Sequence, residues 1–187
     1  MSPIATGRRA FIALLLALAA ALPCAAIAQE DAAVLERRVK GALLYRFIAY
    51  VEWPESAFAR PDSPFVIGIL GNDALATELQ AFTAGRTAEK RPISVRRLRA
   101  ADSLKDVHML FISASEAHQL DRAVRGAGPT LIVTESPGAL QQGSVIDFTV
   151  VNDQVRFNIS LDSARQRNLR LSSRLLSVAN AVHAGAP

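Results

Sequence analysis

Apolar residues recur at helical spacing over residues 31–51, which predicts the first helix of the fold. At roughly 100° per residue, one face of this helix carries Leu35, Val39, Leu43, Phe47 and Tyr50. Leu44 and Ile48 fall on the opposite side, which begins with the polar Arg37. A helix that is apolar on two sides at its end must be covered twice. We expect the domain that contains this helix to bury one apolar side. The other side could be buried by more of the same domain, by a second copy of the chain or by a partner protein.

Trp53 and Pro54 are expected to close this helix, because the residue before a proline leaves the helical region. Further apolar runs then predict strands over residues 65–70, 93–98, 108–112 and 130–134, with helices over 74–82 and from 113–115 to about Arg125. Strands that alternate with helices are typical of an α/β domain with a mostly parallel central sheet.

Residues 145–151 and 154–159 predict a β-hairpin with Asn152 and Asp153 as its two-residue turn. This turn pairs Phe148 with Phe157, and Ile146 with Ile159, on one face of the hairpin. A slip of one residue would exchange the two faces, so the register is well specified.

After the hairpin, Asp162 is predicted to cap a short helix that Asn168 ends in a left-handed conformation. Residues 169–171 form an extended link, and Ser172 or Ser173 caps a closing helix. The apolar face of that helix carries Leu175, Leu176, Ala179 and Val182.

Residues 1–28 have the pattern of a cleaved export signal. Arg8 and Arg9 precede a short apolar run over 10–22, and residues 26–28 read Ala-x-Ala. The run is too short to span a bilayer comfortably. The two arginines also suggest the twin-arginine (Tat) route, but we expect the general secretory (Sec) route. The mature chain, residues 29–187, is one domain by length.

Composition narrows the possible functions. The whole chain holds 21 basic and 17 acidic side chains, and two of the basic ones lie in the leader, so charge is nearly balanced. The one cysteine, Cys24, also lies in the leader. Disulfides, thiol chemistry and cysteine metal sites are therefore excluded for the mature domain.

Basic residues gather around the predicted strand 93–98: Arg86, Lys90, Arg91, Arg96, Arg97 and Arg99. They could face anionic headgroups or an acidic partner, but charge that protects an open sheet edge is the commoner explanation. No aromatic residues interleave with them, and an exported protein has no expected role on nucleic acid.

No reaction centre is expected from the remaining residue types. Gly68 and Gly71 lack the third glycine of a dinucleotide fingerprint. The three histidines are not at metal-ligand spacing, and His108 reads as structural at the start of a strand. No G-x-S-x-G elbow is present. We therefore expect neither catalysis nor a cofactor nor a metal.

Motifs in order along the mature chain resemble the YfiR-like family of exported domains. They are Tyr45-x-Phe47-x-x-Tyr50-Val51-Glu52-Trp53-Pro54, Phe65-x-Ile67-Gly68-Ile69-Leu70-Gly71, Leu110-Phe111-Ile112-Ser113 with Glu116, Gly143-x-x-Ile146-x-Phe148, Arg156-Phe157-Asn158-Ile159 with Leu161 and Ala164, and Leu169-x-Leu171-Ser172-Ser173-x-Leu175-Leu176. The resemblance implies a small periplasmic α/β protein, often dimeric and without enzymatic activity. The best-known member represses a membrane-bound diguanylate cyclase through its periplasmic sensor domain, which lowers cyclic-di-GMP and disfavours biofilm. An outer-membrane lipoprotein can sequester that repressor.

Two departures from the family matter. Members that pair cysteines hold loops with disulfides, which this chain cannot do, so redox control is excluded. Gln142-Gly143 stands where a double glycine is usual.

These observations lead to one main hypothesis and one alternative. The main hypothesis is a periplasmic adaptor, a homodimer, whose partner-binding candidates are Leu44, Ile48, Tyr50 and Trp53. Trp53, with Tyr45 and Phe47, could equally belong to the core. The alternative is a small-molecule sensor with a crevice at the carboxyl ends of the strands, lined by residues 71–73 and 113–115.

Overall fold

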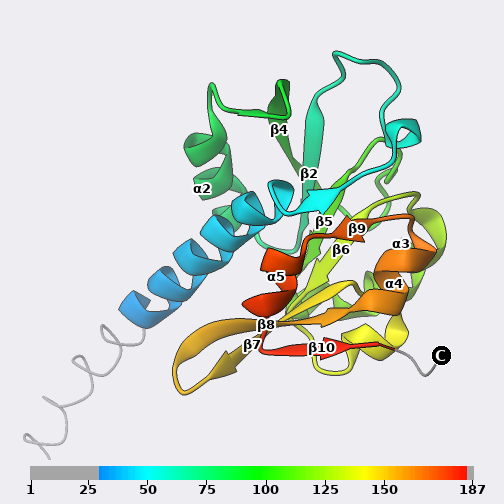
Figure 1. Cartoon of the computed structure of the whole chain (residues 1–187). Helices are drawn as coiled ribbons and strands as arrows, with labels where there is room; N and C mark the ends of the chain where they lie inside the picture. Colours follow the sequence, from blue (N-terminus) through cyan, green and yellow to red (C-terminus); the bar gives the residue numbers. More distant parts are fainter. Residues whose placement is uncertain (1–29, 185–187) are drawn as a thin grey trace, which may run out of the picture. The chain divides into compact units, whose positions relative to one another are not determined.

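The computed structural model describes residues 30–184 (Figure 1). The expected leader, residues 1–28, lies outside the described residues. The chain divides into two units, Met1–Arg37 and Arg38–Pro187. The described residues of the first unit, 30–37, are helical. The second unit contains the helical residues 38–48 and the whole sheet.

The second unit is built on an eight-stranded sheet with the order β10-β8-β7-β6-β5-β2-β4-β3. The parallel strands are β2 (Phe65–Leu70), β4 (Arg91–Leu98), β5 (Met109–Ile112), β6 (Leu131–Thr134) and β7 (Ile146–Val151). The remaining strands are β8 (Gln154–Ser160), antiparallel to β7, β10 (Ala181–His183), parallel to β8, and β3 (Thr87–Ala88), antiparallel to β4. The mostly parallel α/β sheet expected from the sequence is therefore confirmed.

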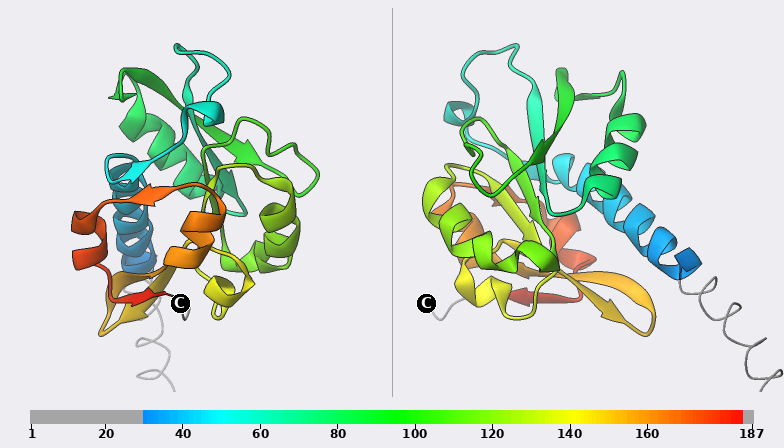
Figure 2. Two further views of the ribbon diagram at one scale, coloured as in Figure 1. Left: turned by 45° about the vertical axis from the view of Figure 1, so that its right-hand side comes forward. Right: turned by 180° about the vertical axis from the view of Figure 1, so that it is seen from behind.

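Helices cover both faces of this sheet (Figure 2). They are α2 (Asp73–Thr83), α3 (Leu120–Gly126), α4 (Leu161–Gln166) and α5 (Ser173–Ser177), with 3-10 turns η1 (Glu55–Ala57), η2 (Ala114–Gln119) and η3 (Ala139–Gln142). A separate two-stranded ribbon joins β1 (Val51–Glu52) to β9 (Arg170–Leu171) in antiparallel pairing.

Side chains of the central strands point alternately to the two faces of the sheet, and each face has its own hydrophobic core. In β2, Ile67 and Ile69 belong to the larger core, which also contains Phe47 of the first helix. Val66 points to the smaller core, which contains Leu120 of α3. Every residue of β2 is buried, as expected for a central strand between two helical layers.

The predicted hairpin register is confirmed. Phe148 pairs with Phe157 and Ile146 with Ile159 across β7 and β8. Asn152 and Asp153 have φ angles of 51° and 57°, the positive values that a type I′ turn needs at both positions. Both phenylalanines contact Phe47, with ring centroids 5.9 and 5.1 Å away, so the hairpin forms part of the inner cover of the first helix.

Two predicted helix ends are wrong. The first helix ends at residue 48 rather than 51, because Val51 and Glu52 leave it to pair with β9. The closing helix α5 ends at Ser177, and Val182 lies in β10 beside Ile159. Backbone pairing with another strand outweighs the helical spacing of apolar residues in both segments.

The caps follow the expected chemistry, with one shift in position. Ser160, not Asp162, caps α4 by accepting a hydrogen bond from the Ser163 N–H. Asn168 has the predicted left-handed conformation, with a φ of 56°. Ser172 caps α5 by accepting from the Leu175 N–H.

Candidate partner-binding surface

The first helix buries the residues that were expected to face a partner. Leu44 is 0% exposed and Ile48 is 5% exposed, and both belong to the larger core of the chain itself. The expected excess of apolar surface at these two positions is therefore wrong. The helix turns Leu44, Phe47 and Ile48 together toward the sheet, whereas Val39, on the other predicted apolar face, is 36% exposed.

Trp53 packs against the larger core, as does Tyr45, and Phe47 is part of it, which is the alternative that the sequence left open for these three residues. Its indole Nε1–H donates to the backbone oxygen of His108 at 2.9 Å. Its ring meets Phe65 edge-on, with centroids 4.8 Å apart. The side chain therefore fastens the segment after the first helix to the start of β2 and β5.

His108 is fixed by main-chain groups on both sides of its ring. Nδ1 accepts from the Val66 N–H at 3.0 Å, so Nε2 carries the proton and donates to the Ala57 oxygen at 3.1 Å. The ring stacks on Phe58 with centroids 4.3 Å apart. Burial lowers the pKa of His108, because desolvation disfavours the imidazolium. This confirms the structural role expected for this histidine.

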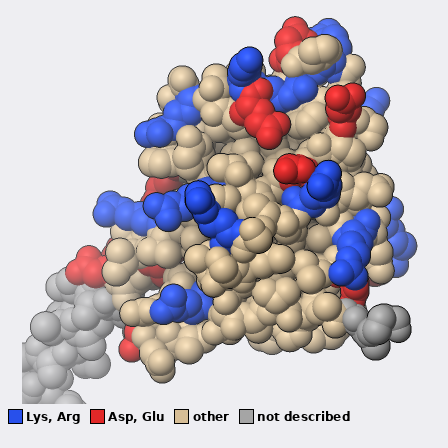
Figure 3. Space-filling view, viewed as in Figure 1, with Lys and Arg blue, Asp and Glu red and all other residues tan. Residues whose placement is uncertain are grey.

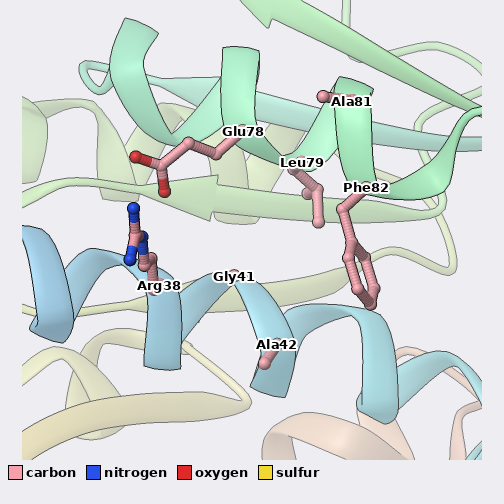
Figure 4. A pocket seen from close by; sticks show the side chains of 7 residues that line it. All are labelled: Arg38, Gly41, Ala42, Glu78, Leu79, Ala81 and Phe82. Atoms are coloured by element: carbon pink, nitrogen blue, oxygen red, sulfur yellow. The ribbon is translucent and has the colours of Figure 1, made fainter.

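The exposed side of the first helix borders a pocket of about 430 Å³ (Figure 4). Its wall on the first helix consists of Arg38, Gly41 and Ala42, and its wall on α2 consists of Glu78, Leu79, Ala81 and Phe82. Figure 4 shows Arg38 and Glu78 pointing toward one another at one end and Phe82 descending toward the helix at the other.

A second pocket of about 390 Å³ continues along the same helix. It lies between the end of the helix and β3, and its lining consists of Tyr45, Arg46, Ile48, Ala49, Tyr50, Thr87, Ala88 and Glu89. Of the four predicted partner-binding residues, Ile48 and Tyr50 therefore border a cavity, whereas Leu44 and Trp53 line neither pocket.

An aromatic pair separates the two pockets. Tyr45 and Phe82 meet edge-on with ring centroids 5.1 Å apart. The guanidinium of Arg86 lies over both rings, 5.6 Å from the Tyr45 centroid and 4.5 Å from the Phe82 centroid. Its Nε–H donates to the Phe82 oxygen at 2.8 Å. Sequence reasoning missed this group, although phenylalanine and arginine four residues apart at the end of a predicted helix are a signal for it.

Polar side chains meet at the carboxyl ends of β5 and β6, where β7 begins. Lys40 forms an ion pair with Glu135, which also accepts from the Ala114 N–H at 3.1 Å. Asp147 accepts from the Thr134 hydroxyl at 3.1 Å. Burial raises the pKa of Asp147 to about 6, because desolvation favours the neutral carboxylic acid.

The two segments expected to line a sensor crevice do lie together. Ser113 and Ser115 share a hydrogen bond of 2.8 Å, and a side-chain carbon on Gly71 would overlap the Ser113 hydroxyl. Asn72 is occupied in capping α2 through the Leu75 N–H at 3.0 Å. The segments pack against each other, and a ligand between them stays a prediction.

The described part of the chain contains no cluster of three or more metal-ligating His, Cys, Asp or Glu side chains. Among residues 30–184, no helix is long and apolar enough to cross a membrane. The basic strand β4 lies next to the short edge strand β3, with Arg96 and Arg97 exposed, which agrees with charge protecting a sheet edge.

Comparison with known proteins finds one matching family and a similar solved structure. Residues 37–180 match the family described as YfiR/HmsC-like. A solved structure of a conserved domain protein from Vibrio cholerae O1 biovar El Tor strain N16961 is similar with a TM-score of 0.48 and 10% identity, over 63% of this chain and 54% of that one. This chain thus spans about half the length of that protein. The comparison with curated proteins finds no match.

The family match agrees with the motifs from Tyr45 to Leu176 that suggested it. The YfiR/HmsC-like family is regulatory and non-catalytic, acts in the periplasm and is associated with cyclic-di-GMP signalling. The match covers most of the chain, from the first helix to the edge of β10, and the protein belongs to the YfiR/HmsC-like family.

Proposed function

We propose that this protein is a non-enzymatic periplasmic adaptor that binds and represses the external sensor domain of an inner-membrane diguanylate cyclase. The observation that carries this proposal is the family match over residues 37–180. The general secretory route would export the chain to the periplasm, where removal of residues 1–28 leaves the mature domain. Repression there lowers cyclic-di-GMP inside the cell and disfavours biofilm.

Such an adaptor acts by binding one conformation of its receptor better than the other. The shift it can produce is limited by its difference in affinity for the two conformations. Changing a cyclase from about 99% active to about 1% active needs a preference of roughly 10⁴-fold. A rigid binding surface favours high affinity, because little ordering free energy is lost on binding.

The arrangement of His108 supports a role other than catalysis. Both of its ring nitrogens are committed to main-chain groups, and aromatic rings cover it. A general base needs a nitrogen that can reach a substrate proton. Its geometry is that of a structural anchor.

Deletion of the gene is expected to raise intracellular cyclic-di-GMP, and expression in trans to restore the original level. An unchanged level in the deletion strain, with every cyclase of the host expressed, contradicts the proposal.

We also propose that the protein forms a homodimer and that an outer-membrane lipoprotein is a further partner. Analytical ultracentrifugation of the purified chain tests the first of these, and co-purification with a candidate lipoprotein tests the second.

A small-molecule sensor is the second candidate function. The observation that favours it is the buried Ser136 hydroxyl, at the carboxyl end of β6, which has no hydrogen-bond partner among the described residues. Parallel α/β sheets bind ligands at this edge. A thermal-shift screen tests the candidate, since a ligand that stabilises the isolated domain supports it.

A further inference from the structure

We propose that an acidic, amphipathic helix of the partner protein docks on the outer side of the first helix. The site is the helix groove, which we define as the two pockets that flank the Tyr45–Phe82 pair, from Arg38 along the first helix to Tyr50, just after the helix ends. This inference rests on the proposed function, because it assigns the surface and the partner chemistry by which the adaptor acts.

The shape of the groove suits bulky apolar side chains from outside. Gly41, Ala42 and Ala81 carry little or no side chain, so neither helix fills the space between them. Phe82 is 44% exposed, which is unusual for a large aromatic residue on a helix that also supplies core residues. An amphipathic helix that lays its apolar side into a groove is a common mode of peptide recognition.

The aromatic pair gives the groove a rigid centre. Phe82 is held by Tyr45 at one edge and by the Arg86 guanidinium over its face. Aromatic and arginine side chains dominate the binding energy of protein interfaces. Because these three are already packed together, little side-chain entropy remains to be lost when a partner binds.

The charges around the groove indicate an acidic occupant. Arg46 and Arg86 are exposed and form no ion pair with any residue in the described part of the chain. Two carboxylates also border the groove: Glu78 points toward Arg38 (Figure 4), and Glu89 lines the second pocket. Arg38, Arg46 and Arg86 together exceed them by one positive charge. Figure 3 shows Lys and Arg side chains gathered over the first helix in this view. Carboxylates at the margin of a docked helix would complement the two guanidinium groups.

A second copy of the chain fits this groove less well. Symmetric contact places the same patch of both copies together. Arg46 and Arg86 of one copy would then approach the same residues of the other, and like charges across an interface are unfavourable. The observations therefore favour a different protein as the occupant.

The test measures binding of the full chain, purified from the periplasm, to the purified external domain of the cyclase identified by the deletion experiment. The groove variants are Phe82→Glu, Ala42→Trp and Arg86→Glu. The matched control is Val150→Glu, which places the same charge at an apolar residue, 54% exposed, in the β7–β8 hairpin. Melting curves confirm that each variant is folded.

We expect Phe82→Glu and Ala42→Trp to weaken binding at least about tenfold, and Val150→Glu to leave it unchanged. Wild-type affinity should fall as salt rises from about 50 to 500 mM, and Arg86→Glu should flatten that dependence. If the folded groove variants bind the external domain as tightly as wild type does, the inference is overturned while the proposed function stands. The same holds if Val150→Glu weakens binding as much as the groove variants do.

Two other results also overturn the inference. Affinity independent of salt contradicts an acidic occupant. Conversion of a dimer to a monomer by Phe82→Glu, with cyclase binding intact, identifies the groove as a self-interface. The proposed function itself is contradicted if the wild-type chain binds no external domain of a cyclase and deletion leaves cyclic-di-GMP unchanged. The inference then fails with it.

Discussion

Lys40 and Glu135 are 95 residues apart in the sequence and form an ion pair of 2.5 Å. Their side chains are only 11% and 17% exposed. The second oxygen of Glu135 accepts from the Ala114 N–H. A single carboxylate therefore joins the first helix, the carboxyl end of β6 and the start of η2, and holds the helix that borders the groove.

Replacing Lys40 by methionine is expected to destabilise the fold by about 3 kcal/mol, because it leaves a mostly buried carboxylate without its cation. The double variant Lys40→Met with Glu135→Gln should recover part of this loss. Urea unfolding measures both. Arg125→Met is the control, because its ion pair with Asp121 is exposed and should contribute less than about 1 kcal/mol. Equal effects of Lys40→Met and Arg125→Met would contradict the assignment.

Gly71→Ala is expected to be much more destabilising than Gly85→Ala. Both glycines have left-handed backbones, with φ angles of 81° and 72°. A side-chain carbon at Gly71 would overlap the Ser113 hydroxyl and lie 2.6 Å from Glu116 Cγ, whereas nothing lies within 4 Å at Gly85. Gly85→Ala should therefore show only the backbone penalty of about 1–2 kcal/mol, and Gly71→Ala several kcal/mol lower stability in thermal unfolding. Equal losses would show that the contact at Gly71 can relax.

Local patterns in the sequence were sufficient to predict the hairpin and the central strands. Asn152 and Asp153 fix the turn, and the turn fixes which side chains share a face, so the pairing of Phe148 with Phe157 follows without knowledge of the rest of the fold. The buried run of β2 is equally local, because it reports burial on both faces.

Relationships between distant segments were not predictable in the same way. Helical spacing shows that Leu44 and Ile48 are apolar, but not that the sheet covers both of them. The end of the first helix depends on the pairing of Val51 with Leu171, which is 120 positions later. The groove depends on which side of α2 faces Ala42, and periodicity does not determine that orientation.

Burial should keep His108 neutral, with its proton on Nε2, to a pH below 6.5. Burial lowers its pKa in the folded state, so the unfolded chain takes up a proton first as pH falls. This site therefore stabilises the fold less as the pH falls below about 6.5. Ring-nitrogen chemical shifts measured by NMR identify the tautomer and the titration midpoint. A midpoint at or above 6.5, or a proton on Nδ1, would contradict the bonds to Val66 and Ala57.

Asp147 is expected to have the opposite effect on the pH dependence of stability. Burial raises its pKa from 3.8 to about 6, and the nearby charge of Glu135 acts in the same direction. Between these two values the folded chain binds the proton more tightly than the unfolded chain, so stability falls as pH rises from about 4 to about 6. The difference of about two pKa units limits this loss to about 3 kcal/mol.

Asp147→Asn should remove this loss, so that the variant gains stability relative to wild type as pH rises from 4 to 7. Thr134→Val removes a hydroxyl that donates to the carboxylate and lowers its pKa, so it should move the transition to higher pH. Urea unfolding at intervals of pH, together with direct titration of the carboxyl carbon by NMR, measures both effects. Parallel stability profiles for wild type and Asp147→Asn between pH 4 and 7 would contradict the raised pKa. A transition at lower pH in Thr134→Val would show that the hydroxyl stabilises the protonated acid instead.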